Sequence, residues 1–115
     1  MAVDPDFLLV IISDEIGSGP SDLGAKLTDL FFRNLVVADA RPAKVLFLNS
    51  GIFLTTEGSP ALPHLRALAE GGTTIVSCIT CLTYHDRMGR IAVGEAGDMK
   101  GTVKDLTTFR KVVTL

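Results

Sequence analysis

Phe7-Leu8-Leu9-Val10-Ile11-Ile12 is the stretch that decides the fold, because all six of its residues are apolar. A strand with one face in water alternates apolar and polar side chains, whereas a strand covered on both faces is apolar throughout. The run therefore predicts a central strand of a parallel sheet with helices on both faces. It is far shorter than the roughly 20 apolar residues that cross a bilayer, so no membrane span is expected.

A helix is expected soon after this strand. Residues 13–20 are rich in serine, glycine and acidic side chains, which is typical of a turn. The helix is predicted to begin near Ser21 or Asp22. Its apolar side chains recur at helical spacing and are expected to pack on the sheet: Leu23, Leu27, Leu30, Phe31 and Leu35.

The rest of the chain alternates short apolar runs with helical segments. Further strands are expected at 45–48, 73–76, 91–93 and 111–113, and a loop with a helical turn at 78–88. One helix is expected at 60–70, with Ser59 as N-cap, Gly71-Gly72 as its stop, and Leu62, Leu65 and Leu68 facing the core. Another is expected after Asp98, carrying Met99, Val103 and Leu106. This order predicts a three-layer α/β/α fold of flavodoxin-like appearance, with a five-stranded, mostly parallel sheet.

Length, composition and charge restrict the class of protein. The chain has 115 residues, enough for one domain, 1–115, and too few for two. With 47% hydrophobic and 21% charged residues, a globular protein is expected and disorder is excluded. The net charge of -2 argues against nucleic acid or an anionic membrane as the main partner. The N-terminus lacks the features of a secretory signal, which predicts a cytoplasmic protein.

Cys78 and Cys81, the two cysteines of the chain, follow the apolar run 73–76 with two residues between them. In a parallel sheet the carboxyl ends of the strands open onto the crevice where such sheets bind ligands. Two thiols at this spacing can share a sulfur atom, close a disulfide or supply half of a metal site. In the cytoplasm they are expected to be working thiols rather than a structural disulfide.

Polar residues also follow the first two expected strands. Ser13 and Asp14 come after the first, and Asn49, Ser50 and Gly51 come after the second. Since parallel strands end on the same side of a sheet, both segments are expected to converge with the cysteine loop. The backbone amides near Asn49 are candidates to hold a sulfur anion or a small oxyanion.

Five landmarks occur in an order that resembles the DsrE/DsrF-like family, and most closely the C-terminal domain of the YedF group of selenium-metabolism proteins. They are Ser13-Asp14, the strand end 47–51, the segment 57–60 that includes Glu57, the cysteine segment 77–82, and the segment 92–95 that ends at Glu95. The resemblance implies a five-stranded parallel sheet between helices, assembly into trimers, hexamers or related rings, and sulfur carried as a cysteine persulfide. Relatives commonly have an N-terminal TusA-type sulfur-carrier domain that this sequence lacks. The chain is therefore interpreted as a stand-alone version or an excised domain. A separate TusA-like protein is a candidate partner.

The resemblance also implies roles for the site residues. The sulfur-carrying cysteine of the family lies at the start of the loop after the third strand, which Cys78 matches, and Cys81 would resolve the persulfide or protect it as a disulfide. Tyr84-His85-Asp86 occupies the positions where relatives have an aromatic pair followed by glycine. Tyr84 is therefore included among the predicted pocket residues, and the backbone conformation of this loop is left unpredicted.

We therefore expect a sulfurtransferase-like persulfide carrier, with selenium as an alternative cargo, rather than a turnover enzyme. Two alternatives remain: a dithiol redox protein, and a non-catalytic oligomeric module that binds a small ligand and keeps both cysteines buried. The possible zinc ligands are the two cysteines, His64, His85 and carboxylates, and the sequence has no second Cys-x-x-Cys. A zinc site completed across subunits is therefore only a minor alternative, and no metal and no other cofactor is expected. A homo-oligomer is expected because apolar Phe32, Val36 and Val37 lie beside the predicted core stripe of their helix.

Overall fold

A computed structural model describes residues 2–115 and contains a five-stranded sheet in the order β4-β3-β2-β1-β5. All neighbouring strands are parallel. The strands are β1 (Ala2–Ile11), β2 (Ala40–Phe47), β3 (Thr74–Cys78), β4 (Glu95–Gly97) and β5 (Lys111–Thr114). The α-helices are α1 (Ser21–Val36), α2 (Leu62–Glu70), α3 (Ile79–Tyr84) and α4 (Met99–Thr108), and two short 3-10 helices are η1 (Asn49–Leu54) and η2 (Met88–Arg90).

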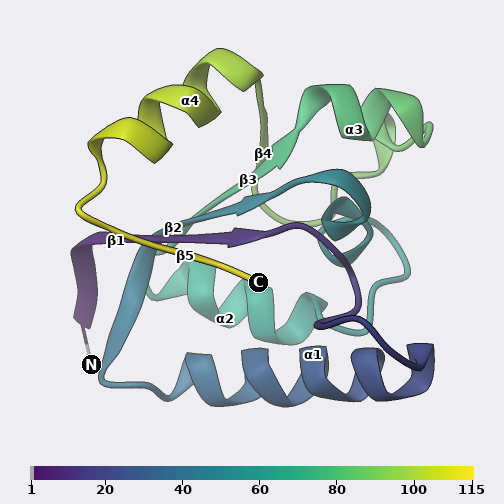
Figure 1. Ribbon diagram of the computed structural model, residues 1–115, viewed down its shortest axis with the longest axis horizontal. Coiled ribbons are helices and arrows are strands. Elements are labelled where there is room, and N and C mark those ends of the chain that lie inside the picture. The colour runs from purple at the N-terminus through teal and green to yellow at the C-terminus, as the bar shows by residue number, and fades with distance from the viewer. Residues whose placement is uncertain (1) are drawn as a thin grey trace.

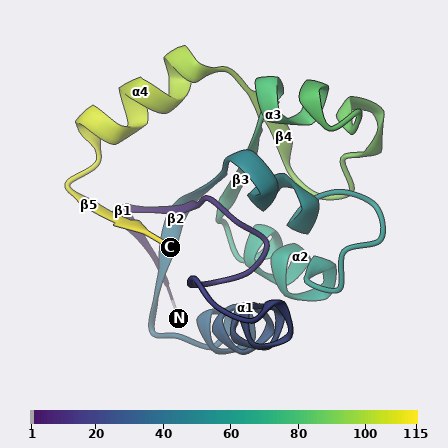
Figure 2. The same ribbon diagram turned by 45° about the vertical axis from the view of Figure 1, so that its right-hand side comes forward.

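The helices cover the sheet on both faces. Helices α1 and α2 lie below the sheet in the view of Figure 1, and α3 and α4 lie above it. The turned view keeps the same grouping, with α1 and α2 on one side and α3 and α4 on the other (Figure 2). The prediction of a three-layer α/β/α fold with a five-stranded parallel sheet is confirmed.

β1 is an interior strand, paired with β2 on one side and β5 on the other, as the apolar run at its carboxyl end predicts. Leu9 and Ile11 are fully buried in the larger core cluster, which faces α1 and α2. Leu8 and Val10 point to the opposite face, where they form the smaller cluster with Leu46 and Val76. The residues of the run are buried up to Ile11, where the strand ends, because both faces of the strand are covered, and Ile12 is exposed.

Our prediction of which α1 side chains pack on the sheet is largely wrong. The helix begins at Ser21, but its buried residues are Gly24, Thr28 and Phe32. The loop after β1 determines this orientation. The Thr28 hydroxyl donates to the carbonyl of Asp14 at 3.2 Å and accepts from the Ile16 N–H at 3.1 Å. Leu23, Leu27 and Leu30 are exposed as a result, while Phe31 and Leu35 are partly buried against the core.

The fourth strand was also misplaced, because the structure has it at Glu95–Gly97 and not at 91–93. Gly94 adopts a left-handed conformation with φ of 78°, and a Cβ atom there would overlap the carbonyl oxygen of Ile75. This turn brings residues 95–97 alongside β3. The apolar residues before it fill the core instead: Val93 is buried, and Ile91 forms an isolated bridge with Thr56.

Helix α2 buries Leu62, Leu65 and Leu68 as predicted, although it begins at Leu62. The Ser59 hydroxyl accepts a hydrogen bond from the Ala61 N–H at 3.1 Å and so closes the turn before the helix. No helix among residues 2–115 has the length and apolar character needed to span a membrane.

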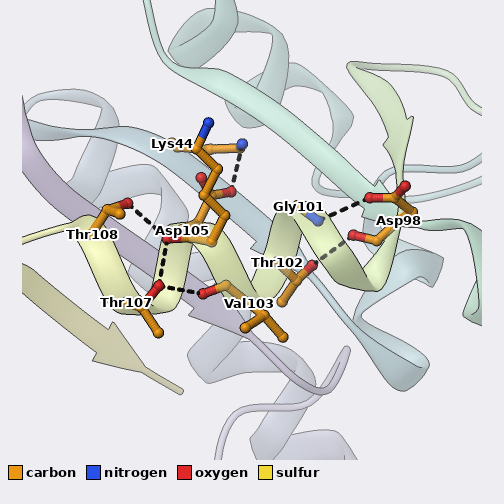
Figure 3. Close-up of polar contacts among 9 residues, drawn as sticks. Lys44, Asp98, Gly101, Thr102, Val103, Asp105, Thr107 and Thr108 are labelled. Atoms are coloured by element: carbon orange, nitrogen blue, oxygen red, sulfur yellow. Dashed lines mark hydrogen bonds and ion pairs between the residues drawn. The ribbon is translucent and has the colours of Figure 1, made fainter.

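Helix α4 has the predicted cap but a polar inner face. The Asp98 carboxylate accepts from the Gly101 N–H at 2.9 Å (Figure 3). Asp105 forms an ion pair with Lys44 of β2 at 2.6 Å, and Thr102 is buried beneath the helix. The apolar side chains of the helix, Met99, Val103 and Leu106, are exposed.

Candidate functional site

Three segments meet at the carboxyl end of the sheet. The Leu48 N–H donates to the carbonyl of Ile11 at 2.9 Å, which joins the ends of β2 and β1. Gly51 lies so close to β1 that an added Cβ would be 2.5 Å from the Ile11 carbonyl oxygen and 3.5 Å from the Ser13 nitrogen. Residues 49–51 therefore lie against the loop after β1, as the parallel topology predicts.

The third segment carries the thiols. Cys78 is the last residue of β3 and directly precedes α3, and Cys81 lies in the first turn of that helix. The Asn49 N–H donates a hydrogen bond to the Cys81 sulfur at 3.0 Å. Asn49 has a left-handed backbone conformation, with φ of 52°, at the point where the chain leaves β2 and enters η1. The end of the second strand thus supplies a hydrogen-bond donor to a thiol from the third.

The two cysteines differ in exposure. Both are free thiols, and Cys78 is buried with 4% of its surface exposed, whereas Cys81 is partly exposed. Burial raises the pKa of the Cys81 thiol, and its contact with the Cys78 thiol raises that pKa further, through a hydrogen bond and through charge repulsion. The Asn49 N–H acts in the opposite direction and lowers the pKa, because it stabilises the thiolate. Cys81 is therefore mainly protonated at neutral pH, with a donor already placed for the anion.

Aromatic and cationic side chains hold the loop after α3 in place. The rings of Phe53 and His85 lie 4.7 Å apart, and the guanidinium of Arg87 lies 4.8 Å from the centre of the Phe53 ring. Arg87 also donates to the Thr56 hydroxyl at 3.2 Å and to the Glu57 carbonyl at 3.3 Å. Phe53 and Arg87 were not among the predicted site residues. They are 34 positions apart in the sequence, so only the tertiary structure reveals their contact.

The structure shows the backbone conformation of this loop at Asp86. It adopts a left-handed conformation with φ of 55°, which glycine adopts without strain and other residues rarely do. The backbone at this position is thus of the kind that a glycine favours, and an aspartate occupies it.

Besides Asn49 and Gly51, four other predicted pocket residues lie at or near the junction of these segments. Ser13 accepts a hydrogen bond from the Glu15 N–H at 3.0 Å, and Ser50 lies in η1. Asp14 lines a cavity of about 150 Å³ together with Phe53 and Pro60. Glu57 is exposed, and its carbonyl oxygen is the one that Arg87 binds.

Tyr84 and Glu95 are placed differently. Tyr84 is 84% exposed at the end of α3, with its ring edge-on to His85 at 5.0 Å. Glu95 is not brought to the thiols. It lines a separate cleft beneath α4 together with Lys44 and Asp105. The predicted strand at 91–93 would have ended just before Glu95, whereas β4 begins with this residue.

The histidines have other partners. His64 lies 3.1 Å from a carboxylate oxygen of Asp29, and His85 packs against Phe53. Within residues 2–115, no three side chains of histidine, cysteine, aspartate or glutamate come together as a metal site.

Comparison of the sequence with models of protein families and with curated proteins gives no match. Among solved structures, the chain is similar to the crystal structure of the ychN protein from E. coli, with a TM-score of 0.67 and 14% sequence identity. The similarity covers 97% of this chain and 100% of that one. The ychN protein has a DsrE/DsrF-like fold, and the chain has this fold too.

Proposed function

We propose that the protein is a sulfurtransferase-like carrier of sulfur in the form of a cysteine persulfide. The observation that carries this proposal is the hydrogen bond from the Asn49 N–H to the Cys81 sulfur, at 3.0 Å, beside a second thiol. A sulfur carrier needs a thiol that external sulfur can reach and a donor that stabilises its anion. The DsrE-like fold is consistent with a place in a sulfur relay.

Exposure changes the roles that we assign to the two cysteines. The sequence favoured Cys78 as the residue that carries sulfur, but its side chain is buried and Cys81 is partly exposed. A bulky sulfur donor meets Cys81 first. The proposal therefore assigns Cys81 as the residue that accepts the sulfur and Cys78 as the thiol that resolves it.

The chemistry proceeds in two steps. The Cys81 thiolate attacks the outer sulfur of a donor persulfide, R–S–SH, forms Cys81–S–SH and releases the donor as R–S⁻. An acceptor thiolate then attacks the outer sulfur and takes it, which regenerates the Cys81 thiolate. Without an acceptor, the Cys78 thiolate attacks the Cys81 sulfur, so that a disulfide forms and the outer sulfur leaves reduced as HS⁻.

The finer parts of the proposal follow the sequence resemblance. The chain is proposed to belong to the YedF group, to act in the cytoplasm, and to exchange sulfur, or selenium in its place, with a TusA-like carrier. The short helix α3, with six residues, favours this function over a dithiol redox protein of the thioredoxin kind, in which the Cys-x-x-Cys motif begins a long helix.

The test is intact-mass spectrometry after brief exposure to polysulfide and removal of the excess. We compare the wild type with the Cys78→Ala and Cys81→Ala variants. The Cys78→Ala variant should gain the mass of one sulfur atom and keep it longer than the wild type, because no neighbouring thiol resolves the persulfide. The Cys81→Ala variant should gain none in the same time.

Two outcomes would contradict the proposal. Loading that persists in Cys81→Ala and disappears in Cys78→Ala would return the carrier role to Cys78. If neither the wild type nor the variants gain sulfur while all of them are folded, both thiols are structural, and the non-catalytic binding module becomes the better explanation.

A further inference from the structure

Helix α1 presents an apolar surface that no part of residues 2–115 covers. Leu23, Leu27 and Leu30, which we call the leucine stripe, are 49%, 40% and 42% exposed. The helix forms the outermost layer on its side of the sheet (Figure 1). Single exposed leucines are ordinary, but three in a row along one helix form a continuous apolar strip of the kind that marks an interaction surface.

A groove runs beside the stripe. It has a volume of about 580 Å³ and is lined mainly by apolar side chains, among them Ile16, Leu27, Leu30, Phe31, Leu35 and Leu115. Leu27 and Leu30 thus form one wall of the groove and also project from the helix. A ridge and a groove side by side on one surface can fit together with their own copies across a two-fold axis.

The charges on α1 indicate which occupant fits. Asp22, Lys26, Asp29 and Arg33 follow one another along the helix next to the leucine stripe, at intervals of four, three and four residues. Their signs alternate, and the order reads minus, plus, minus, plus. An antiparallel copy of α1 brings the same flank of both helices together and therefore places Asp22 opposite Arg33 and Lys26 opposite Asp29.

We propose that this face of α1 binds a second copy of the same chain, with the two α1 helices antiparallel about a two-fold axis close to Leu27 and Leu30. Leu27 and Leu30 of each copy enter the groove of the other, and the alternating charges pair along the rim. This inference is independent of the sulfur chemistry, because the stripe lies on the opposite side of the sheet from α3 (Figure 2).

Sedimentation velocity between about 1 and 100 μM tests the proposal. The wild type should form a dimer, or a larger assembly built from such dimers. The double variant Leu27→Asp, Leu30→Asp should raise the dissociation constant of this contact by about 100-fold or more, because four apolar contacts per dimer are replaced by buried charges. The matched control is Val103→Asp, Leu106→Asp on α4, where side chains of 52% and 42% exposure are changed on the other side of the sheet. The control should assemble like the wild type.

A charge exchange tests the antiparallel arrangement. Arg33→Glu should weaken the dimer by about 10-fold, because by symmetry it places two like-charge pairs at the rim. Adding Asp22→Arg should restore assembly. Arg33 also pairs with Asp29 of its own helix at 2.8 Å, but loss of that contact would not be rescued by a change at Asp22.

The proposal is overturned if the wild type is a monomer at 100 μM, including the case in which α1 binds lipid vesicles or another protein instead. It is also overturned if the protein assembles but the α4 variant, and not the α1 variant, dissociates it. Assembly through α1 without rescue by Asp22→Arg would refute the antiparallel pairing.

Discussion

Asn49 and Asp86 are the two residues other than glycine, within residues 2–115, whose φ is positive. Both border the cysteine segment: Asn49 contacts Cys81, and Asp86 lies just after α3. Asparagine and aspartate tolerate this conformation better than other residues, yet it still costs energy. At Asn49 the left-handed backbone accompanies an N–H that points at the Cys81 sulfur, so we connect the unusual conformation with the chemistry of the thiol.

The pH dependence of Cys81 reactivity follows from the causes of its raised pKa. In the wild type, burial and the Cys78 thiol keep Cys81 protonated at neutral pH, so alkylation by iodoacetamide should accelerate as the pH rises past the ordinary cysteine pKa. Cys78→Ala removes the second cause and lowers the pKa. At pH 7.5 the alkylation of Cys81 should then be about 3-fold faster, since more thiolate is present. Peptide mapping over a pH series measures this rate, and an unchanged pH profile would show that the two thiols are not coupled.

A glycine at position 86 should make the folded protein more stable than the native aspartate does. Asp86→Gly removes the strain of the left-handed backbone and should raise the free energy of unfolding by about 0.5 to 1 kcal/mol. Asp86→Ala keeps the strain and loses the polar side chain, so it should lower that free energy by a similar amount. Urea unfolding compares the three proteins. If both variants lose the same free energy of unfolding, the carboxylate of Asp86, and not its backbone conformation, determines stability at this position.

At the scale of elements, β4 depends on the turn before it. Gly94→Ala places a methyl group against the Ile75 carbonyl in a backbone that disfavours it, and this should cost about 2 to 4 kcal/mol. The matched control is Gly89→Ala, because Gly89 has open space around its Cα and no positive φ. That change should alter the free energy of unfolding by less than about 0.5 kcal/mol. Urea unfolding measures the free energy of unfolding of both variants. Equal changes in the two variants would show that the turn at Gly94 is not required for β4.

The two outer helices of the fold share a property that periodicity alone does not reveal. Both α1 and α4 turn small or polar residues toward the sheet, with Thr28 buried under α1 and Thr102 under α4. Most of their leucines and the Met99 and Val103 side chains of α4 are exposed instead, although Phe32 of α1 is fully buried. The contact of α4 with the sheet includes the Lys44–Asp105 ion pair, whose two side chains are largely buried (Figure 3).

At the scale of the whole molecule, the exposed stripe links stability to concentration. If two copies associate through α1, the folded state gains stability by mass action, and the melting temperature should rise with protein concentration. Calorimetry at about 5 and 200 μM should show this rise for the wild type and for the Val103→Asp, Leu106→Asp control. The Leu27→Asp, Leu30→Asp variant should melt at one temperature at both concentrations. A wild type with a constant melting temperature would argue against the contact.

The sequence by itself determined the architecture of the sheet. Continuous apolar runs identify strands that are buried on both faces in any register, and their alternation with helical segments requires parallel crossovers. The same reasoning placed the strand ends, and therefore the meeting of Asn49 and the cysteine segment, on one side of the sheet. These conclusions need no knowledge of which face of a helix is covered.

Only the tertiary structure decided which side chains are buried. Whether Leu27 or Thr28 faces the core depends on the loop after β1, whose atoms hydrogen-bond to Thr28 from 12 and 14 positions away. Similarly, the close approach of Gly94 to Ile75 moves the fourth strand beyond its apolar segment, and the packing of α3 buries Cys78 but leaves Cys81 within reach. Apolar spacing shows that a helix has a face to cover, but contacts between distant segments decide what covers it.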